Sequence, residues 1–188
     1  GELNEVQWIF EATGAGKLDA YIDTTNFGGF ITEGATAGVT IDNEQSIGNP
    51  AIAKNVIAVA SFVTRNEWTP FDTGLGKQAQ LDENAVQVTL GAISSFSSHG
   101  PPRRTTVVTG VKPDIAAPGE ILASAMHSGV TDEPGTRVMK PLPNAYVLLE
   151  GTSMASPAAA GVIALMLQAK PTLTVAQIRD AFQQTAKV

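Results

Sequence analysis

The clearest pattern of apolar and polar positions lies in the C-terminal part of the chain. A short apolar run at 147–149 precedes the small and polar residues 151–157, and a long apolar stretch around 162–167 follows them. This order predicts a strand, a sharp turn and a helix from about Ser153 to Ala169. The helix should end there because Pro171 cannot continue it.

A second helix is predicted to begin at Thr174. Gln177 stands three residues later, which is the spacing of a capping box, in which each side chain bonds the other residue's backbone N–H. The apolar residues recur with a period near 3.6 and would form one buried face. They are Val175, Ile178, Ala181 and Phe182.

Upstream, apolar runs predict strands. Residues 56–60 are continuously apolar, which is typical of a parallel strand covered on both faces. Short strands are expected at 121–125 and 86–90, and a hairpin at 6–10 and 18–22. Residues 50–54 suit a short helical turn, and residues 112–119 are expected to form a turn-rich segment. Strands that alternate with helices place the chain in the α/β class. We expect two parts in the chain: a β-rich insertion segment, 1–40, and a larger α/β part, 41–188.

Composition excludes several functions. The 188 residues are 43% hydrophobic and 16% charged, which argues against disorder, and the net charge of −6 without a basic cluster argues against nucleic acid as a partner. The longest apolar helix is interrupted by Gln168 and Lys170, so no membrane partner is expected. There are no cysteines and only two histidines. Thiol catalysis is thereby excluded, and neither a metal site nor another cofactor is expected.

The predicted strand-to-helix turn places Ser153 at the N-terminus of a helix. Backbone N–H groups there lack helical partners and carry partial positive charge. A serine in that position can attack a carbonyl carbon, and its own N–H can help to hold the resulting oxyanion. Serine is also a common N-cap, so capping is an equally simple interpretation of Ser153. Neither the hydrolase elbow nor the Ser-x-x-Lys pattern fits, because Ala155 and Ser156 occupy their diagnostic positions.

A third serine pattern fits more closely. Residues 151–157, Gly-Thr-Ser-Met-Ala-Ser-Pro, resemble the serine signature of the subtilisin-like serine proteases, or subtilases. Three further segments resemble the same family in the same order. They are 50–60, which leads into a strand, 95–101, Ser-Phe-Ser-Ser-His-Gly-Pro, and 112–119, Lys-Pro-Asp-Ile-Ala-Ala-Pro-Gly. Ala158 stands where many members have histidine, a position that is not the catalytic one.

The resemblance implies a fold and a mechanism. The fold would be part of a subtilisin-like three-layer α/β structure with a mostly parallel sheet. Ser153 would be the catalytic nucleophile of peptide-bond hydrolysis through an acyl-enzyme, Gly151 and Thr152 would form the approach to it, and Pro157 would lie in the first helical turn. The substrate would be a protein or peptide. The resemblance also implies secretion or a cell-envelope location, reached through bacterial-type export.

The residues that activate the serine are not recognisable. No motif for the family's catalytic aspartate or histidine is present, and His99 and His127 suit turn and surface positions. The family also uses an asparagine to hold the oxyanion. Asn49, Asn43 and a residue upstream of this chain are the three candidates for it, and the upstream residue is favoured. No acidic cluster has the ligand spacing of a calcium site.

We therefore expect a C-terminal catalytic fragment that is inactive alone. Its partners would be the missing N-terminal part of the same protein or, through uncovered apolar helix faces, a second copy of itself. The alternatives are a non-catalytic subtilase-like pseudoenzyme and, less consistent with four ordered motifs, an unrelated α/β binding module in which Ser153 only caps its helix.

Overall fold

The computed structural model describes residues 45–71, 74–82, 85–102, 111–130, 137–140 and 145–186. The chain divides into two units, Gly1–Ile41 and Asp42–Val188, and all the described residues belong to the second. The hairpin expected at 6–10 and 18–22 and the β-rich character of 1–40 lie outside the described residues and stay predictions.

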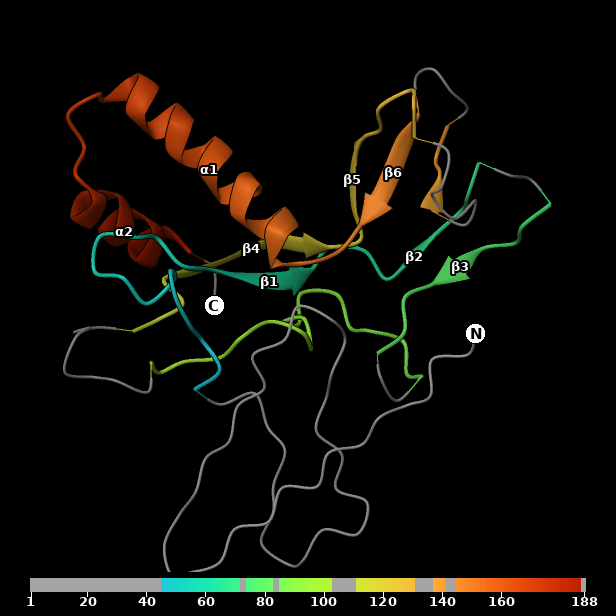
Figure 1. Ribbon diagram of the computed structural model, residues 1–188, viewed down its shortest axis with the longest axis horizontal. Coiled ribbons are helices and arrows are strands. Elements are labelled where there is room, and N and C mark those ends of the chain that lie inside the picture. Colours follow the sequence, from blue (N-terminus) through green and yellow to red (C-terminus); the bar gives the residue numbers. More distant parts are fainter. Residues whose placement is uncertain are drawn as a thin grey trace, which may run out of the picture. The chain divides into compact units, whose positions relative to one another are not determined.

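Six strands and two helices follow one another in the described part of the chain (Figure 1). They are β1 (Val59–Val63), β2 (Glu67–Trp68), β3 (Gln78–Ala79), β4 (Ile115–Glu120), β5 (Leu122–Ala125), β6 (Tyr146–Leu149), α1 (Thr152–Ala169) and α2 (Val175–Thr185).

The strands form three separate pairs in the described residues. β1 and β4 are parallel, with Val59 opposite Ile115, whereas β2–β3 and β5–β6 are antiparallel. The α/β class with a parallel pair is confirmed. Only one of these three pairs is parallel, since β5 and β6 pair with each other and not with β1 or β4.

Helix α1 packs against β4 and β1 (Figure 1). Its contact surface is small: Ala155 and Ala159 are buried against Ala117 of β4, and Val59 of β1 packs beside them. Small side chains allow the helix and the strands to approach closely. A second cluster of Trp68, Ile121 and Leu148 lies around the β5–β6 pair. Ile121 has a φ of 54°, a left-handed conformation that is rare for a β-branched residue, and it separates β4 from β5.

Helix α1 is long and apolar enough to cross a membrane by length and composition alone, with a mean hydropathy of 1.3 over 18 residues. The core helix of a soluble protein meets the same criterion, so this feature does not assign a membrane role. Helix α2 confirms its prediction closely: Thr174 is the N-cap, both capping-box bonds to Gln177 are present, and Ile178 is buried.

Two local predictions were wrong, and a third held only in part. The expected turn-rich segment 112–119 contains most of β4, and the expected strand 86–90 makes only an isolated bridge between Gln87 and Leu81. The apolar run 56–60 becomes strand only from Val59 onward. Residues 50–54 form turns that include a bond from the Ile52 N–H to the Gly48 carbonyl four residues earlier, which agrees with the short helical turn expected there. For 112–119 the parallel pairing with β1, a segment distant in the sequence, decides the conformation, which the local pattern cannot reveal.

Candidate functional site

Ser153 lies on the first turn of α1, as its second residue. The N-cap is Gly151, with a φ of 142° that favours glycine, and no side chain caps this helix. The interpretation of Ser153 as an N-cap is therefore wrong. Its side chain is exposed, and among the described residues no hydrogen bond occupies its hydroxyl. The hydroxyl is free to meet a ligand.

A hydrogen bond fixes the turn before Ser153 to the end of β4. The Gly151 N–H donates to the Gly119 carbonyl over 2.8 Å. A Cβ on Gly119 would clash with the Ser61 side chain and would lie 2.8 Å from the Ala155 Cβ and 2.9 Å from the Gly151 oxygen. Only glycine lets the strand end, the turn and the helix approach this closely. Ser153 is thereby held at the carboxyl end of a parallel strand, where α/β proteins place their sites.

Buried serines join the 95–101 segment to the same strands. The Ser97 hydroxyl accepts from the Ser61 N–H over 3.1 Å, and the hydroxyls of Ser61 and Ser94 lie 2.8 Å apart. All three serines are almost completely buried. Ser61 belongs to β1, and its hydroxyl lies where a Cβ on Gly119 would be, so this network joins the 95–101 segment to β1 beside the end of β4.

Pro157 differs from its expected place. It is the sixth residue of α1 and not part of the first turn. A proline there removes the N–H that would have bonded the Ser153 carbonyl four residues earlier. The helix begins at Thr152 because Gly151, with its positive φ, allows the chain to turn sharply from strand into helix at that point.

A cavity of about 220 Å³ lies beside the turn. Its lining includes Thr152, the neighbour of Ser153, together with Gly48, Asn49 and Ser98. The structure thus brings one of the three asparagine candidates, Asn49, into the cavity that Thr152 lines. Asn43 lies outside the described residues.

Neither histidine is bonded to Ser153 among the described residues. The His99 backbone N–H donates to the Ser46 hydroxyl over 3.0 Å, which joins the 95–101 segment to the chain at residue 46. The His127 Nδ1 accepts from the Gly129 N–H over 3.0 Å within its own turn. Within the described ranges no cluster of three or more His, Cys, Asp or Glu side chains could hold a metal ion.

The geometry defines an α/β protein that presents an exposed serine at a glycine-bounded strand-to-helix turn. Residues 12–188 match the subtilase family, and the chain therefore belongs to that family. It is 33% identical over 84% of its length to the subtilisin-like protease SBT3 of Solanum lycopersicum, and 31% identical over 77% to the serine protease AprX of Bacillus subtilis. The minor extracellular protease Vpr of Bacillus subtilis is 39% identical over 50% of this chain.

The chain spans only a fraction of these relatives: 19% of SBT3, 27% of AprX and 10% of Vpr. The resemblance carried by the four motifs is confirmed at the level of the family.

Proposed function

We propose that this chain supplies the nucleophile-bearing part of a subtilisin-type serine endopeptidase, with Ser153 as the catalytic nucleophile. The observation that carries the proposal is the position of Ser153: its side chain is exposed, makes no hydrogen bond within the described part of the chain, and is held at the carboxyl end of β4 through Gly151 and Gly119. Membership of the subtilase family supports the same role.

In the proposed reaction the Ser153 Oγ attacks the carbonyl carbon of a peptide bond and its proton passes to a base. The carbonyl oxygen gains negative charge, which the N–H of Ser153, at the positive end of α1, can stabilise. The tetrahedral species then expels the amine, which takes up that proton, and water hydrolyses the resulting acyl-enzyme. The substrate is a protein or a peptide.

The base is the missing element of this scheme. A serine hydroxyl does not lose its proton near neutral pH unless a base such as histidine accepts it. Since neither His99 nor His127 bonds to Ser153 in the described structure, we propose that the catalytic Asp and His come from an N-terminal part of the same protein outside this chain. The isolated chain is then inactive. By analogy with relatives such as the extracellular protease Vpr, we propose secretion or a cell-envelope location.

Labelling with a fluorophosphonate probe tests this function. The 188-residue chain alone should remain unlabelled, whereas a longer protein that includes its upstream part should be labelled at Ser153. Ser153→Ala should abolish that label, and Ser156→Ala, which removes another exposed serine of the same helix, should leave it. Labelling of the short chain would contradict the need for a second part. An unlabelled but folded longer protein would instead favour the non-catalytic alternative.

A further inference from the structure

A second candidate site surrounds Glu120, the last residue of β4. Glu120 is only 3% exposed, and its Oε2 has no hydrogen-bond partner in the described structure. None of the ion pairs among the described residues includes it, although its backbone carbonyl accepts from the Thr64 hydroxyl over 3.1 Å. A buried carboxylate oxygen without a hydrogen bond is costly, so a group that bonds to the Glu120 Oε2 would bind favourably.

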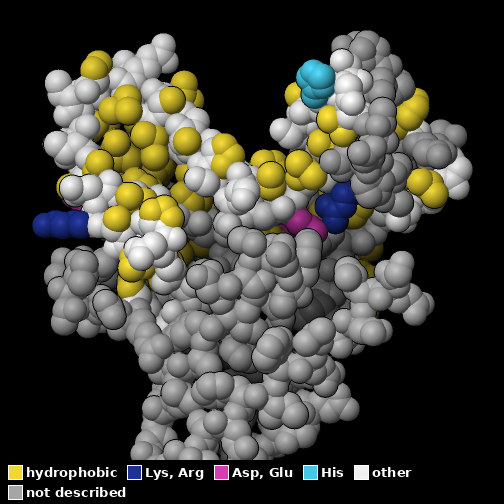
Figure 2. Space-filling model, in the orientation of Figure 1, with side chains coloured by type: hydrophobic (Ala, Val, Ile, Leu, Met, Phe, Trp, Pro, Cys, Tyr) yellow, Lys and Arg dark blue, Asp and Glu magenta, His cyan; other side chains and the backbone are white. Residues whose placement is uncertain are grey.

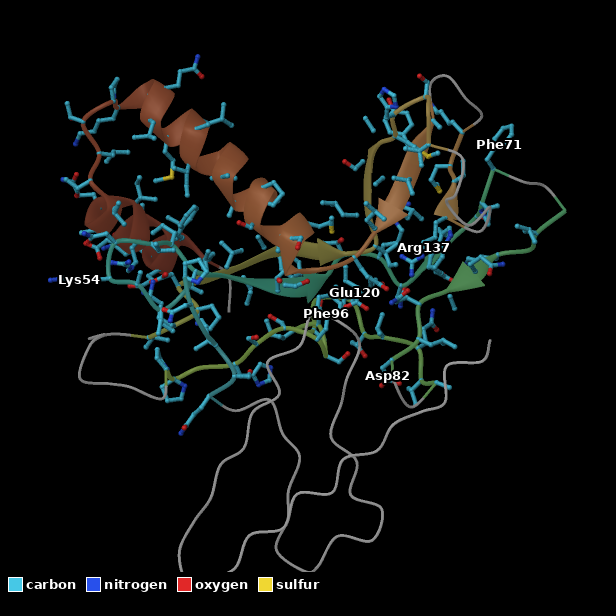
Figure 3. All side chains as sticks on the ribbon, viewed as in Figure 1. Lys54, Phe71, Asp82, Phe96, Glu120 and Arg137 are labelled. Atoms are coloured by element: carbon cyan, nitrogen blue, oxygen red, sulfur yellow. The ribbon has the colours of Figure 1, made fainter. Side chains whose placement is uncertain are left out.

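Glu120 is one of the residues that line a cavity of about 240 Å³. Figure 3 shows Glu120 between the end of the β1–β4 pair and the segment that carries Asp82 and Phe96. Aliphatic side chains form much of the cavity wall, and Asp82 and Ser95 add polar groups. The aliphatic members are Val63, Val86, Val88 and Ile93.

This cavity is distinct from the one beside Ser153. Gly119 faces Gly151 and Ala155, whereas the next residue, Glu120, lines a cavity formed with residues 82–95. The register shifts between Phe62 and Val63, so that Glu120 pairs with Val63 and Gly119 is passed over. Because consecutive residues of a strand face opposite sides, Gly119 can meet the serine turn while Glu120 lines the second cavity.

The lining distinguishes between kinds of cation. A bound calcium ion takes six to eight oxygen ligands, whereas no cluster of three or more acidic, His or Cys side chains occurs in the described ranges. A long aliphatic stem with a charged end fits better, because the stem can pack on valine and isoleucine while its head meets the carboxylate. We propose that the Glu120 cavity binds the cationic side chain of a peptide lysine or arginine.

The test uses the 188-residue chain and two cationic probes, Nα-acetyl-lysine amide and Nα-acetyl-arginine amide. Nα-acetyl-norleucine amide is the neutral control. Methyl NMR resonances of Val63, Val86, Val88 and Ile93 should shift saturably with at least one cationic probe. The neutral probe should bind at least tenfold more weakly. This readout is independent of the reactivity of Ser153, so its failure would leave the proposed function untouched.

Glu120→Gln should weaken binding of the cationic probe at least tenfold. The matched control is Glu67→Gln, the same chemical change at an exposed glutamate that pairs with Lys77 over 2.5 Å, and it should bind as the unaltered chain does. Equal binding of the neutral probe, shifts confined to other methyl groups, or unaltered binding by a folded Glu120→Gln would each overturn the proposal. Should Glu120→Gln fail to fold, the comparison of cationic and neutral probes on the unaltered chain still decides the outcome.

Discussion

Arg179 of α2 donates its Nε–H to Asp114 Oδ1 over 2.6 Å, which ties the last helix to the start of β4. The other oxygen of the same carboxylate accepts from the Lys112 ammonium over 2.6 Å and from the Ala58 N–H over 2.7 Å. Arg179 also donates to the carbonyl of Val56. One buried carboxylate therefore joins three segments that are distant in the sequence.

Asp114→Asn should be strongly destabilising. The Asp114 side chain is 1% exposed and the Lys112 side chain 3%, so the substitution leaves a buried ammonium without its counter-charge. Breaking one partner of such a pair costs about 3–5 kcal/mol in the free energy of unfolding. Urea denaturation followed by circular dichroism measures the loss. The control is Asp180→Asn, the same chemical change at an exposed position of α2, which should change the free energy of unfolding by less than about 0.5 kcal/mol. A loss below about 1 kcal/mol for Asp114→Asn would show that the cluster contributes little.

Gly119→Ala should disturb the serine turn. The added Cβ would press on Ser61, Ala155 and the Gly151 carbonyl, all of which are backbone or tightly packed atoms. Overpacking of this kind costs about 1–3 kcal/mol, and here it should also reduce fluorophosphonate labelling of Ser153 in the longer protein. Thermal unfolding and labelling measure the two effects separately.

Gly161→Ala is the matched control for that substitution. An added Cβ at Gly161, within α1, would meet nothing within 4 Å. Alanine is the better helix former, so this change should stabilise the chain by about 0.5–1 kcal/mol. Similar losses for the two variants would contradict the role given to Gly119.

The exposed face of α1 predicts self-association of the 188-residue chain. Val162 is 47% and Leu165 66% exposed, and Figure 2 shows hydrophobic side chains gathered on this side of the molecule. Exposed apolar surface of this kind favours contacts between molecules. Sedimentation velocity should show an apparent mass that rises with concentration, and Leu165→Glu should lower the association constant at least tenfold. Gln168→Glu adds the same charge at another exposed position of α1 and should have little effect. A monomer at every concentration would refute this expectation.

Predictions that depend on neighbouring residues were the most accurate. The capping box of Thr174 and Gln177 and the apolar spacing of α2 are local, so the sequence contains all the information required. The position of Ser153 on a strand-to-helix turn could be inferred for the same reason. The exact N-cap could not, because Gly151 and Ser153 are both acceptable N-caps and packing against Gly119 decides between them.

Predictions that depend on distant residues were less successful. Residues 112–119 contain two prolines and a glycine, which locally indicate turns, yet their pairing with β1 makes most of them strand. The partnership of Asp114 with Arg179 joins residues 65 positions apart. The lack of a hydrogen bond to the Glu120 Oε2 in the described structure depends on which side chains surround it, and nothing in the local pattern around 120 indicates that cavity.

Thr174→Ala should show how much α2 depends on its cap. The Thr174 hydroxyl accepts from the Gln177 N–H over 3.3 Å, and the Gln177 Oε1 accepts from the Thr174 N–H over 2.9 Å. Removing the hydroxyl should cost about 1 kcal/mol in the free energy of unfolding, and Gln177→Ala should cost less because its exposed bond can be replaced by water.

The double variant should lose less than the sum of the two single losses, since each bond positions the other. Chemical denaturation of all four chains measures this coupling. Thr172→Ala, an exposed threonine outside the helix, serves as the control. Strictly additive losses would mean that the two bonds act independently and would contradict the expected coupling.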